Sequence, residues 1–309
     1  MNHFINLKDI SAKDLRKIIT DAKKRKNLRK NLSTLEVDKG APLKGKMLIQ
    51  MFEKTSLRTR ISFYLAIKQL GGGTLTLRPN ELHLGQGGES ISDTAKILST
   101  YGDGFMLRTN SDKKIENFRD HLSIPIINGL SPSSHPTQVL SDIFTVEEII
   151  KKPVSKINIC WVGDSNNVLN SLIAASVKFS FKLSIGCPKK FEPSKKVKAW
   201  VKNNNKKIFV YNDPRKAVIG ADVIFSDKVI SLNDRVNKYK KIEKFKKFKI
   251  DKKLMSFAKK NCIFLHCLPR GSEVSNEVFF GKNSHVWQQA LNRVHVQKSI
   301  LLYCFGKLR

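Results

Sequence analysis

The segment Met47–Gly71 constrains the fold more than any other part of the chain, because it predicts a strand, a short loop and a helix in succession. Residues 47–52 form an apolar run with the length of a buried strand, and Ser56 is a good helix N-cap. Arg58 and Arg60 follow in the first helical turn, where unpaired N–H groups and the helix dipole already favour negative charge. A bound anion would stabilise both arginines, so the segment predicts a phosphate site. The alternative is that both side chains point into water.

The same alternation of strand and helix extends through the whole chain. In the first half we expect strands at 47–52, 74–77, 104–108 and 125–128, and helices at 12–27, after Ser56, at 92–100 and at 138–150. Lys151-Lys152-Pro153 interrupts the pattern. A second alternation then begins, with strands at 157–162, 182–187, 207–211, 222–225 and 262–266 and a final helix at 287–305. Elements of these lengths in this order predict parallel sheets.

The predicted fold class is therefore α/β, with two doubly wound parallel-sheet domains and the active site in the cleft between them. We place the domains at residues 1–150 and 151–309, with the final helix packing back on the first domain. A length of 309 residues suits two domains of ordinary size, and 40% hydrophobic with 27% charged residues is typical of globular proteins. No apolar run approaches 18 residues and no signal peptide is evident, so we expect a cytoplasmic protein without a membrane partner. The five cysteines form no CxxC pair and are expected to be buried, reduced thiols.

The formal net charge of +31 raises the alternative of a nucleic-acid-binding protein. The densest lysine run, residues 238–253, interleaves aromatic residues as a single-strand binder does. Its apolar residues also fit the buried side of an amphipathic segment, and these are Ile242, Phe245, Phe248 and Ile250. We favour the amphipathic interpretation with a solvated lysine face, and expect no nucleic-acid partner. A basic surface would also speed encounters with anionic substrates at low salt.

Polar side chains lie at the ends of five predicted strands or in the segments that follow them. Arg108 ends one strand, His135 follows another, and three more strands are followed by Asn167, Asp227 and Cys267. Each taken alone has an ordinary interpretation as a strand-end charge, a loop residue or a turn residue. Ligands of open parallel sheets, however, bind at the carboxyl ends of the strands. The placement of all five therefore predicts one site to which both domains contribute.

Two other kinds of site are disfavoured. The turn Gly163–Asn167 lacks the GxGxxG pattern, and the next strand ends at Cys187-Pro188-Lys189 where a dehydrogenase would have an acidic residue. His266 and Cys267 are adjacent, so their side chains point to opposite faces of a strand, and no second ligand cluster completes a zinc site. We expect no metal ion and no organic cofactor.

Four motifs carry a resemblance to a known family. Ser56-Leu57-Arg58-Thr59-Arg60 resembles the Ser-Thr-Arg-Thr-Arg carbamoyl phosphate motif of the aspartate/ornithine carbamoyltransferases. His135–Gln138, Gly163–Asn167 and His266–Arg270 are similar to three further motifs in the family's order, the last two indicating the ornithine branch. The similarity spans residues 4–297.

The resemblance implies transfer of the carbamoyl group from carbamoyl phosphate to the δ-amine of ornithine, giving citrulline and phosphate in arginine metabolism. It also implies a homotrimer or a multiple of trimers. An alternative is a carbamoyltransferase for another amine, such as an acylated ornithine or putrescine.

The resemblance also assigns residues to the two substrates. The carbamoyl phosphate site it implies consists of Ser56, Leu57 through its backbone, Arg58, Thr59, Arg108, His135, Gln138, Cys267, Leu268 and Arg293. The implied ornithine site consists of Asn167, Asp227, Ser231 and Leu232. The implied catalytic residues are Arg108, His135, Asp227 and Cys267, with Asp227 and Cys267 favouring the neutral amine. A cis peptide at Leu268-Pro269 is implied as well.

Three departures from the family pattern affect this assignment. Leu57 replaces the usual threonine. The segment Arg78–Gly88 resembles the loop that reaches into a neighbouring subunit, but carries His83 and Gln86 in an altered order. Residues 227–233 depart from Asp-x-Trp-x-Ser-Met-Gly, in the region that the resemblance places against the amine substrate.

Overall fold

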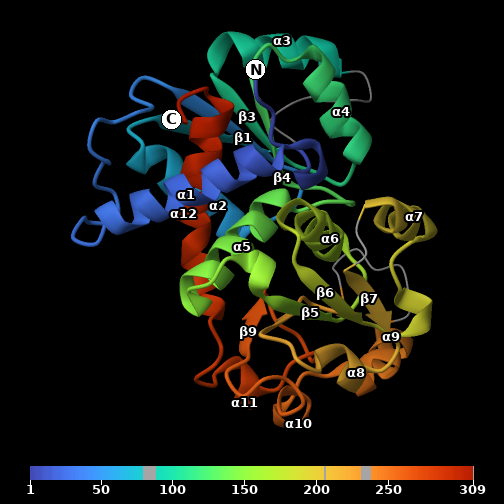
Figure 1. The fold of residues 1–309 in the computed structure, drawn as a ribbon. Coiled ribbons are helices and arrows are strands. Elements are labelled where there is room, and N and C mark those ends of the chain that lie inside the picture. Colours follow the sequence, from blue (N-terminus) through green and yellow to red (C-terminus); the bar gives the residue numbers. More distant parts are fainter. Residues whose placement is uncertain (79–87, 205–206, 231–237, 309) are drawn as a thin grey trace. The chain divides into compact units, whose positions relative to one another are not determined.

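A computed structural model describes residues 1–78, 88–204, 207–230 and 238–308 (Figure 1). The chain divides into two compact units, of which the first is Met1–Phe144 with Leu291–Arg309 and the second is Thr145–Ala290. The division falls inside the helix that precedes the predicted boundary at Lys151, and most of the C-terminal helix belongs to the first unit.

The first unit is built on a parallel four-stranded sheet of order β2-β1-β3-β4. Its elements are a 3₁₀ turn at Leu7–Asp9, α1 (Ala12–Leu28), β1 (Met47–Phe52), α2 (Leu57–Gln69), β2 (Gly73–Leu77), α3 (Ile91–Tyr101), β3 (Gly104–Arg108), α4 (Asp112–His121), β4 (Ile126–Leu130), the start of α5 (Pro136–Ile150) and most of α12 (Val286–Cys304). The predicted strands are confirmed to within two residues. The helix α4 was not predicted.

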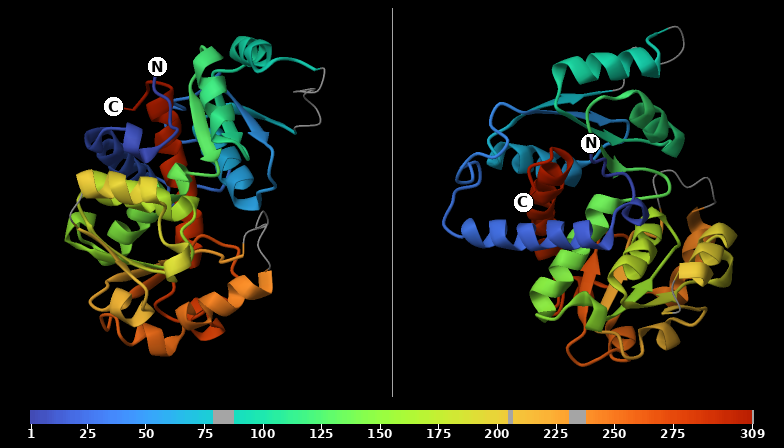
Figure 2. Two further views of the ribbon diagram at one scale, coloured as in Figure 1. Left: turned by 90° about the vertical axis from the view of Figure 1, so that its right-hand side faces the viewer. Right: turned by 45° about the horizontal axis from the view of Figure 1, so that its top comes forward.

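One face of this sheet packs against α3 and α4. Ile49 and Met51 of β1 share a buried cluster with Leu98 of α3 and Phe118 of α4. Side chains alternate along a strand, so Leu48 points to the other face. The helix α1 packs against α12, where the Ser299 Oγ donates to the Asp21 Oδ2 at 2.7 Å, and the right view of Figure 2 shows the two helices crossing.

The register of the central strands determines where the site can form. Phe52 of β1 pairs with Arg108 of β3, and the Glu53 amide donates to the Arg108 carbonyl at 2.9 Å. The carboxyl ends of β1 and β3 therefore lie side by side. As a result, the N-terminus of α2 and the Arg108 side chain start from the same edge of the sheet.

The second unit has a parallel five-stranded sheet of order β7-β6-β5-β8-β9. Its elements are a 3₁₀ turn at Val154–Lys156, β5 (Asn158–Val162), α6 (Asn167–Phe179), β6 (Lys182–Gly186), a 3₁₀ turn at Lys189–Phe191, α7 (Lys195–Asn204), β7 (Ile208–Tyr211), α8 (Pro214–Val218), β8 (Val223–Ser226), α9 (Lys238–Phe245), a 3₁₀ turn at Lys246–Phe248, α10 (Lys252–Met255), β9 (Ile263–His266) and α11 (Asn276–Phe279). The predicted class, two parallel-sheet α/β domains, is confirmed.

The lysine run 238–253 is amphipathic as predicted, but Ile242 was predicted on the wrong face. Phe245, Phe248 and Ile250 are buried as expected, whereas Ile242 is 37% exposed. Lys241 is buried in its place, with its Nζ 2.6 Å from the Asp164 Oδ2. Lys241 and Phe245 are four residues apart and share the inward face of α9, so the helix presents a buried lysine to the partly buried Asp164 carboxylate.

Two bulk expectations can be compared with the fold. None of the five cysteines forms a disulfide bond, and all five are buried, as predicted. In the part of the chain that the structure describes, every helix is too short or too polar to cross a membrane.

Candidate active site

The predicted phosphate site begins at the first turn of α2. Ser56 caps the helix, with its Oγ accepting a hydrogen bond from the Thr59 amide at 3.2 Å. Leu57 is 72% exposed, so this departure from the family motif costs the fold no packing. Arg58 is half-buried in the first turn, whereas Arg60 is exposed. The two arginines therefore have different surroundings, although they are only two residues apart.

Thr59 is the point where three segments of the first unit meet. Its buried Oγ1 accepts a hydrogen bond from the Arg293 Nη2 of α12 at 2.9 Å and from the Arg108 Nη1 of β3 at 3.3 Å. The structure thus brings together three residues that lie far apart in the sequence and that the resemblance assigns to carbamoyl phosphate.

The cluster around Thr59 is strongly electropositive. Burial, followed by the charge of Arg58, lowers the pKa of Arg108 to about 10. Among the described residues, the Arg108 guanidinium contacts no carboxylate, and its buried Nε has no hydrogen-bond partner. Burial also lowers the pKa of His135 well below its ordinary value, as do the charges of Arg293, Arg108 and Arg58. Three guanidinium groups near a buried, neutral imidazole form a site suited to a dianion.

Gln138 lies in the first turn of α5, three residues after His135. Its buried carboxamide donates through Nε2 to the Asp142 Oδ1 at 2.8 Å, which orients the side chain. The Oε1 of Gln138 then remains as an acceptor. An acceptor suits the carbamoyl nitrogen, which carries two N–H donors.

Sequence reasoning missed a brace behind the arginine cluster. The Glu53 carboxylate accepts hydrogen bonds from the Thr109 hydroxyl, the Lys114 ammonium and, at 3.3 Å, the Asn110 amide. Burial opposes ionisation of Glu53, but the bonds from Lys114 and Thr109 outweigh it and lower the pKa. The brace joins the ends of β1 and β3 and so fixes Arg108 relative to α2. A glutamate directly before a cationic motif was the available signal.

A second set of predicted residues meets at the carboxyl edge of the sheet in the second unit. Asp227 follows β8, and Cys267 follows the neighbouring strand β9, where Ser226 pairs with His266. Burial raises the pKa of Asp227, opposed by His266, the Lys228 amide and Asn166. Such a carboxylate is a better proton acceptor than an exposed aspartate.

The turn before α6 contributes two asparagines with different roles. Asn167 is the first residue of α6. Asn166 is its N-cap, with Oδ1 accepting from the amides of Val168 and Leu169, and its Nδ2 donates to the Asp227 Oδ2 at 2.8 Å. The prediction named Asn167 only, and Asn166 is the residue that orients Asp227.

A buried histidine–glutamate pair, also missed from sequence, supports Cys267. The His266 Nε2 lies 3.1 Å from the Glu273 Oε1, and its Nδ1 accepts from the Leu268 amide at 2.9 Å. Glu273 in turn accepts from the Val229 amide at 3.4 Å, in the loop after β8. The pair therefore holds together the two loops that carry Asp227 and Cys267. The expected cis peptide at Leu268-Pro269 is confirmed.

The predicted residues are thus distributed over both units. Ser56, Leu57, Arg58, Thr59, Arg108, His135, Gln138 and Arg293 lie in the first unit, and Asn167, Asp227, Cys267 and Leu268 lie in the second. Ser231 and Leu232, as well as His83 and Gln86, lie outside the described residues. Within the ranges that the structure covers, no group of three or more His, Cys, Asp or Glu side chains is placed to hold a metal ion.

Comparison with known proteins assigns each half of the chain to a described domain. Residues 2–148 match the sequence model of the aspartate/ornithine carbamoyltransferase carbamoyl-P binding domain, and residues 155–304 match that of the Asp/Orn binding domain. An ornithine carbamoyltransferase of Agrobacterium fabrum is 41% identical over 306 residues, covering 98% of each chain. One of Rhizobium meliloti is 42% identical over 306 residues, again covering 98% of each.

The chain is also similar to solved structures of ornithine carbamoyltransferases. Ornithine carbamoyltransferase from Pyrococcus furiosus superposes with a TM-score of 0.90 at 36% identity, covering 99% of this chain and 97% of that one. The anabolic ornithine carbamoyltransferase from Campylobacter jejuni superposes with a TM-score of 0.89 at 35% identity, covering 99% of this chain and 100% of that one.

Proposed function

The chain belongs to the aspartate/ornithine carbamoyltransferase family, and from this premise we propose that it transfers the carbamoyl group of carbamoyl phosphate to the δ-amine of ornithine. The products are citrulline and phosphate. The observation that carries the proposal is the convergence of Arg108 and Arg293 on Thr59 beside the N-terminus of α2.

The phosphate of carbamoyl phosphate binds at this cluster. The first turn of α2 supplies backbone N–H donors and the positive end of the helix dipole. Arg58, Arg108 and Arg293 supply guanidinium groups whose mutual repulsion is relieved by a bound dianion. The same charges then stabilise the leaving phosphate, whose negative charge grows as the bond to the carbamoyl carbon breaks.

The carbonyl oxygen of the substrate lies against His135. Because the pKa of His135 is held far below neutrality, the ring is a neutral hydrogen-bond donor throughout the physiological range. It therefore polarises the carbonyl without delivering a proton to carbamoyl phosphate. Thr59 and Arg108 add to this polarisation, and Gln138 accepts from the carbamoyl nitrogen.

The amine substrate is handled by the second unit. The δ-amine of ornithine resembles a lysine amine and is mostly protonated at neutral pH, so it must lose a proton before it attacks. Asp227, with its raised pKa and its Asn166 partner, receives that proton, assisted by the adjacent Cys267 loop. The amine nitrogen then bonds to the carbamoyl carbon as the carbon–oxygen bond to phosphate breaks, and the second proton of the attacking nitrogen leaves with the phosphate. Asn167 binds the α-amino acid end, and Ser231 and Leu232 line the remaining wall.

The other functions considered receive less support. Ornithine is favoured over acylated ornithines and putrescine because the relatives described above are named for ornithine. A nucleic-acid interface on the lysine run loses two stacking platforms, because Phe245 and Phe248 are buried.

We also propose a homotrimer, or a multiple of trimers, in the cytoplasm. Leu57, Ile61 and Tyr64 form an exposed apolar stripe on α2 at helical spacing, and Leu75 is exposed on β2, an edge strand among the described residues. A second copy of the chain is the occupant that this face requires if the family's assembly is kept. Five buried cysteines without a disulfide bond fit a reducing compartment. Light scattering that shows a fully active monomer would contradict the assembly.

The function is tested by turnover with a panel of amines. Carbamoyl phosphate is supplied with ornithine, N-acetylornithine, putrescine or aspartate, and both phosphate release and ureido product are measured. We expect the highest kcat/KM with ornithine. Better turnover with another amine would reassign the substrate, and no turnover with any of them would refute the transferase.

A further inference from the structure

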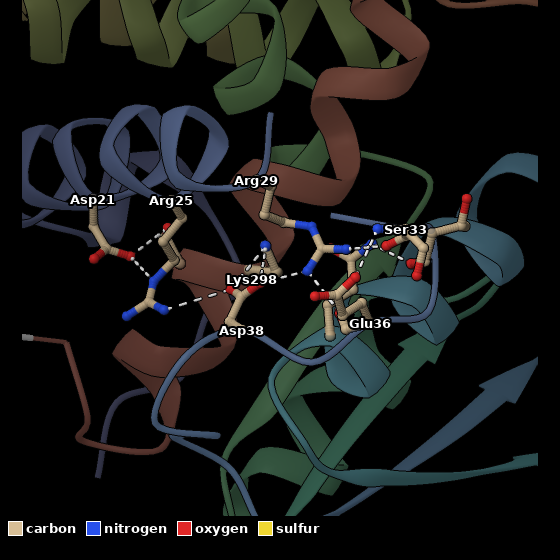
Figure 3. A network of polar contacts seen from close by, with 10 residues as sticks. Asp21, Arg25, Arg29, Ser33, Glu36, Asp38 and Lys298 are labelled. Carbon is tan, nitrogen blue, oxygen red and sulfur yellow. Dashed lines mark hydrogen bonds and ion pairs between the residues drawn. The ribbon is translucent and has the colours of Figure 1, made fainter. Parts of the chain in front are cut away.

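A buried ion-pair network joins α1, α12 and the segment that follows α1 (Figure 3). Its centre is the Asp38 carboxylate, which accepts from the Arg29 Nη1 at 2.6 Å and from the Lys298 Nζ at 2.9 Å. The Arg25 Nη1 lies 3.7 Å from the same carboxylate, and its Nε donates to the Asp21 Oδ2 at 2.8 Å. The Lys298 side chain is completely buried. The proposed reaction uses none of these groups.

The network is connected to the phosphate site through α12. Lys298 lies five residues after Arg293, which is about 7.5 Å along the helix axis and about 140° around it. Arg293 is fixed at Thr59, whereas Lys298 is fixed at Asp38. Two directional contacts on different faces determine both the rotation and the axial position of a helix. Apolar packing alone, which is non-directional, would not.

The network is also connected to the helix that carries Thr59. The Asp38 amide donates to the Gln69 carbonyl at 2.7 Å, at the last residue of α2. The Gln69 Nε2 donates to the Thr34 carbonyl at 2.8 Å. The helices α2 and α12 are therefore joined twice, at Thr59–Arg293 and through Asp38. The second junction lies at the opposite end of α2 from Thr59.

Stability alone does not account for buried charges at this position. A buried ion pair often contributes no more than apolar residues of the same volume, because desolvation offsets the attraction. Desolvation is large here, since burial lowers the pKa of Lys298 to about 8 even though Asp38 opposes the shift. The network has directional contacts that can hold a helix in register, and this role would explain why charged groups are buried here despite the free-energy cost of their desolvation.

We propose that the Asp38–Lys298 ion pair is a positioning device that sets the register of α12, so that the Arg293 guanidinium meets Thr59 in the phosphate site. The inference rests on the proposed function, because it assigns Asp38 and Lys298 to the same carbamoyl phosphate site. Both are positioning residues, since neither contacts the substrate.

The first test uses Lys298→Met and Asp38→Asn in the full chain. Each removes one charge of the pair with little change in volume. Asp120→Asn serves as the control, because the ion pair that Asp120 forms with Arg119 is exposed on the surface. Both network variants should raise the KM for carbamoyl phosphate and the Kd for inorganic phosphate about fivefold to tenfold, because a displaced guanidinium loses its contact. The KM for ornithine should not change in either network variant, and the control variant should change none of these three constants. Lys298→Arg should restore most of the affinity.

The decisive test is a double-mutant cycle with Arg293. If Lys298 acts through Arg293, then Lys298→Met has no further effect on phosphate affinity when Arg293→Ala is already present. Independent, multiplicative effects would overturn the inference. So would a Lys298→Met variant that loses thermal stability but binds phosphate as tightly as the wild type well below its Tm.

These outcomes are separable from failure of the proposed function. Calorimetric binding of phosphate does not require turnover. A wild-type protein that fails to convert carbamoyl phosphate and ornithine would refute the transferase. An active wild type with an unchanged Lys298→Met variant would refute only the positioning role.

Discussion

Individual residues of the proposed phosphate site could be predicted by type, but their protonation could not. The sequence indicated that Arg58, Arg108 and His135 gather at strand ends, because parallel strands share a carboxyl edge. It did not indicate that His135 is buried among three guanidinium groups, since burial depends on contacts between distant segments. For the same reason Asn166, which caps α6 and orients Asp227, was not distinguished from its neighbour.

His135 should remain neutral across the physiological range. Its pKa is lowered by burial and by Arg293, Arg108 and Arg58, so its ring should show no titration between pH 6 and 8 in histidine NMR spectra. The resonance is assigned with His135→Gln. Adding phosphate should raise the pKa, because the dianion offsets the guanidinium charges. A free-protein midpoint between pH 6 and 7 would contradict this environment.

Asp227→Asn should separate stability from turnover. A carboxyl whose folded pKa is raised loses stability as pH rises through that pKa, so an uncharged amide should raise the Tm at pH 7. Turnover with ornithine should fall about a hundredfold through loss of the proton acceptor, with phosphate binding unchanged.

Asp222→Asn is the matched control at the other end of β8. Asp222 accepts from the Asn158 amide at 2.8 Å and from the Lys259 Nζ at 2.7 Å. This variant should lose stability and keep its turnover. If Asp227→Asn lowered the Tm as Asp222→Asn does, the argument that the buried Asp227 carboxylate destabilises the fold at pH 7 would be wrong.

Secondary-structure elements were predicted well where apolar periodicity is strong. The strands of both sheets begin and end within two residues of their expected bounds, because short apolar runs flanked by polar residues are unambiguous in an alternating pattern. The helix α4 was missed, since only Ile115 and Phe118 of its ten residues are buried and the rest are mostly charged. The phase of α9 was wrong at Ile242, because no local pattern reveals that Asp164 faces Lys241.

The Glu53 brace should control how α2 and β3 meet. Glu53→Gln keeps an acceptor for Thr109 but removes the charge that holds Lys114, so the KM for carbamoyl phosphate should rise a few-fold, roughly the net contribution of one ordinary hydrogen bond. The pKa of Glu53 is lowered, so its stabilisation is present above the ordinary glutamate pKa and is lost as pH falls through the folded value. The wild type should therefore lose stability on acidification more steeply than the variant.

Glu116→Gln is the control for the brace, because Glu116 is an exposed residue of the same helix that supplies Lys114. It should change neither the KM nor the acid limb of stability. Equal behaviour of the two variants would show that the brace does not position Arg108.

At the scale of the whole molecule, the fold class and the family were predictable, because four motifs occur in order over nearly the full length and both family models match. The buried contacts that support the proposed site could not be predicted from the sequence. Asp38 and Lys298 are 260 positions apart, and neither belongs to a motif. The net charge of +31 identified no partner by itself, since lysines spread over a surface are compatible with many functions.

The central claim is that a carbamoyl group bound at the Thr59 cluster is transferred to ornithine. Its most direct test is ¹³C NMR of carbamoyl-labelled carbamoyl phosphate mixed with ornithine and the protein. We predict that the label moves to the ureido carbon of citrulline with one phosphate released per product. Arg60→Ala, at an exposed position, should retain this rate, whereas Arg58→Ala should slow it about a hundredfold, the scale of one preorganised donor. Label that reaches only cyanate and bicarbonate, at the rate seen without protein, would contradict the account.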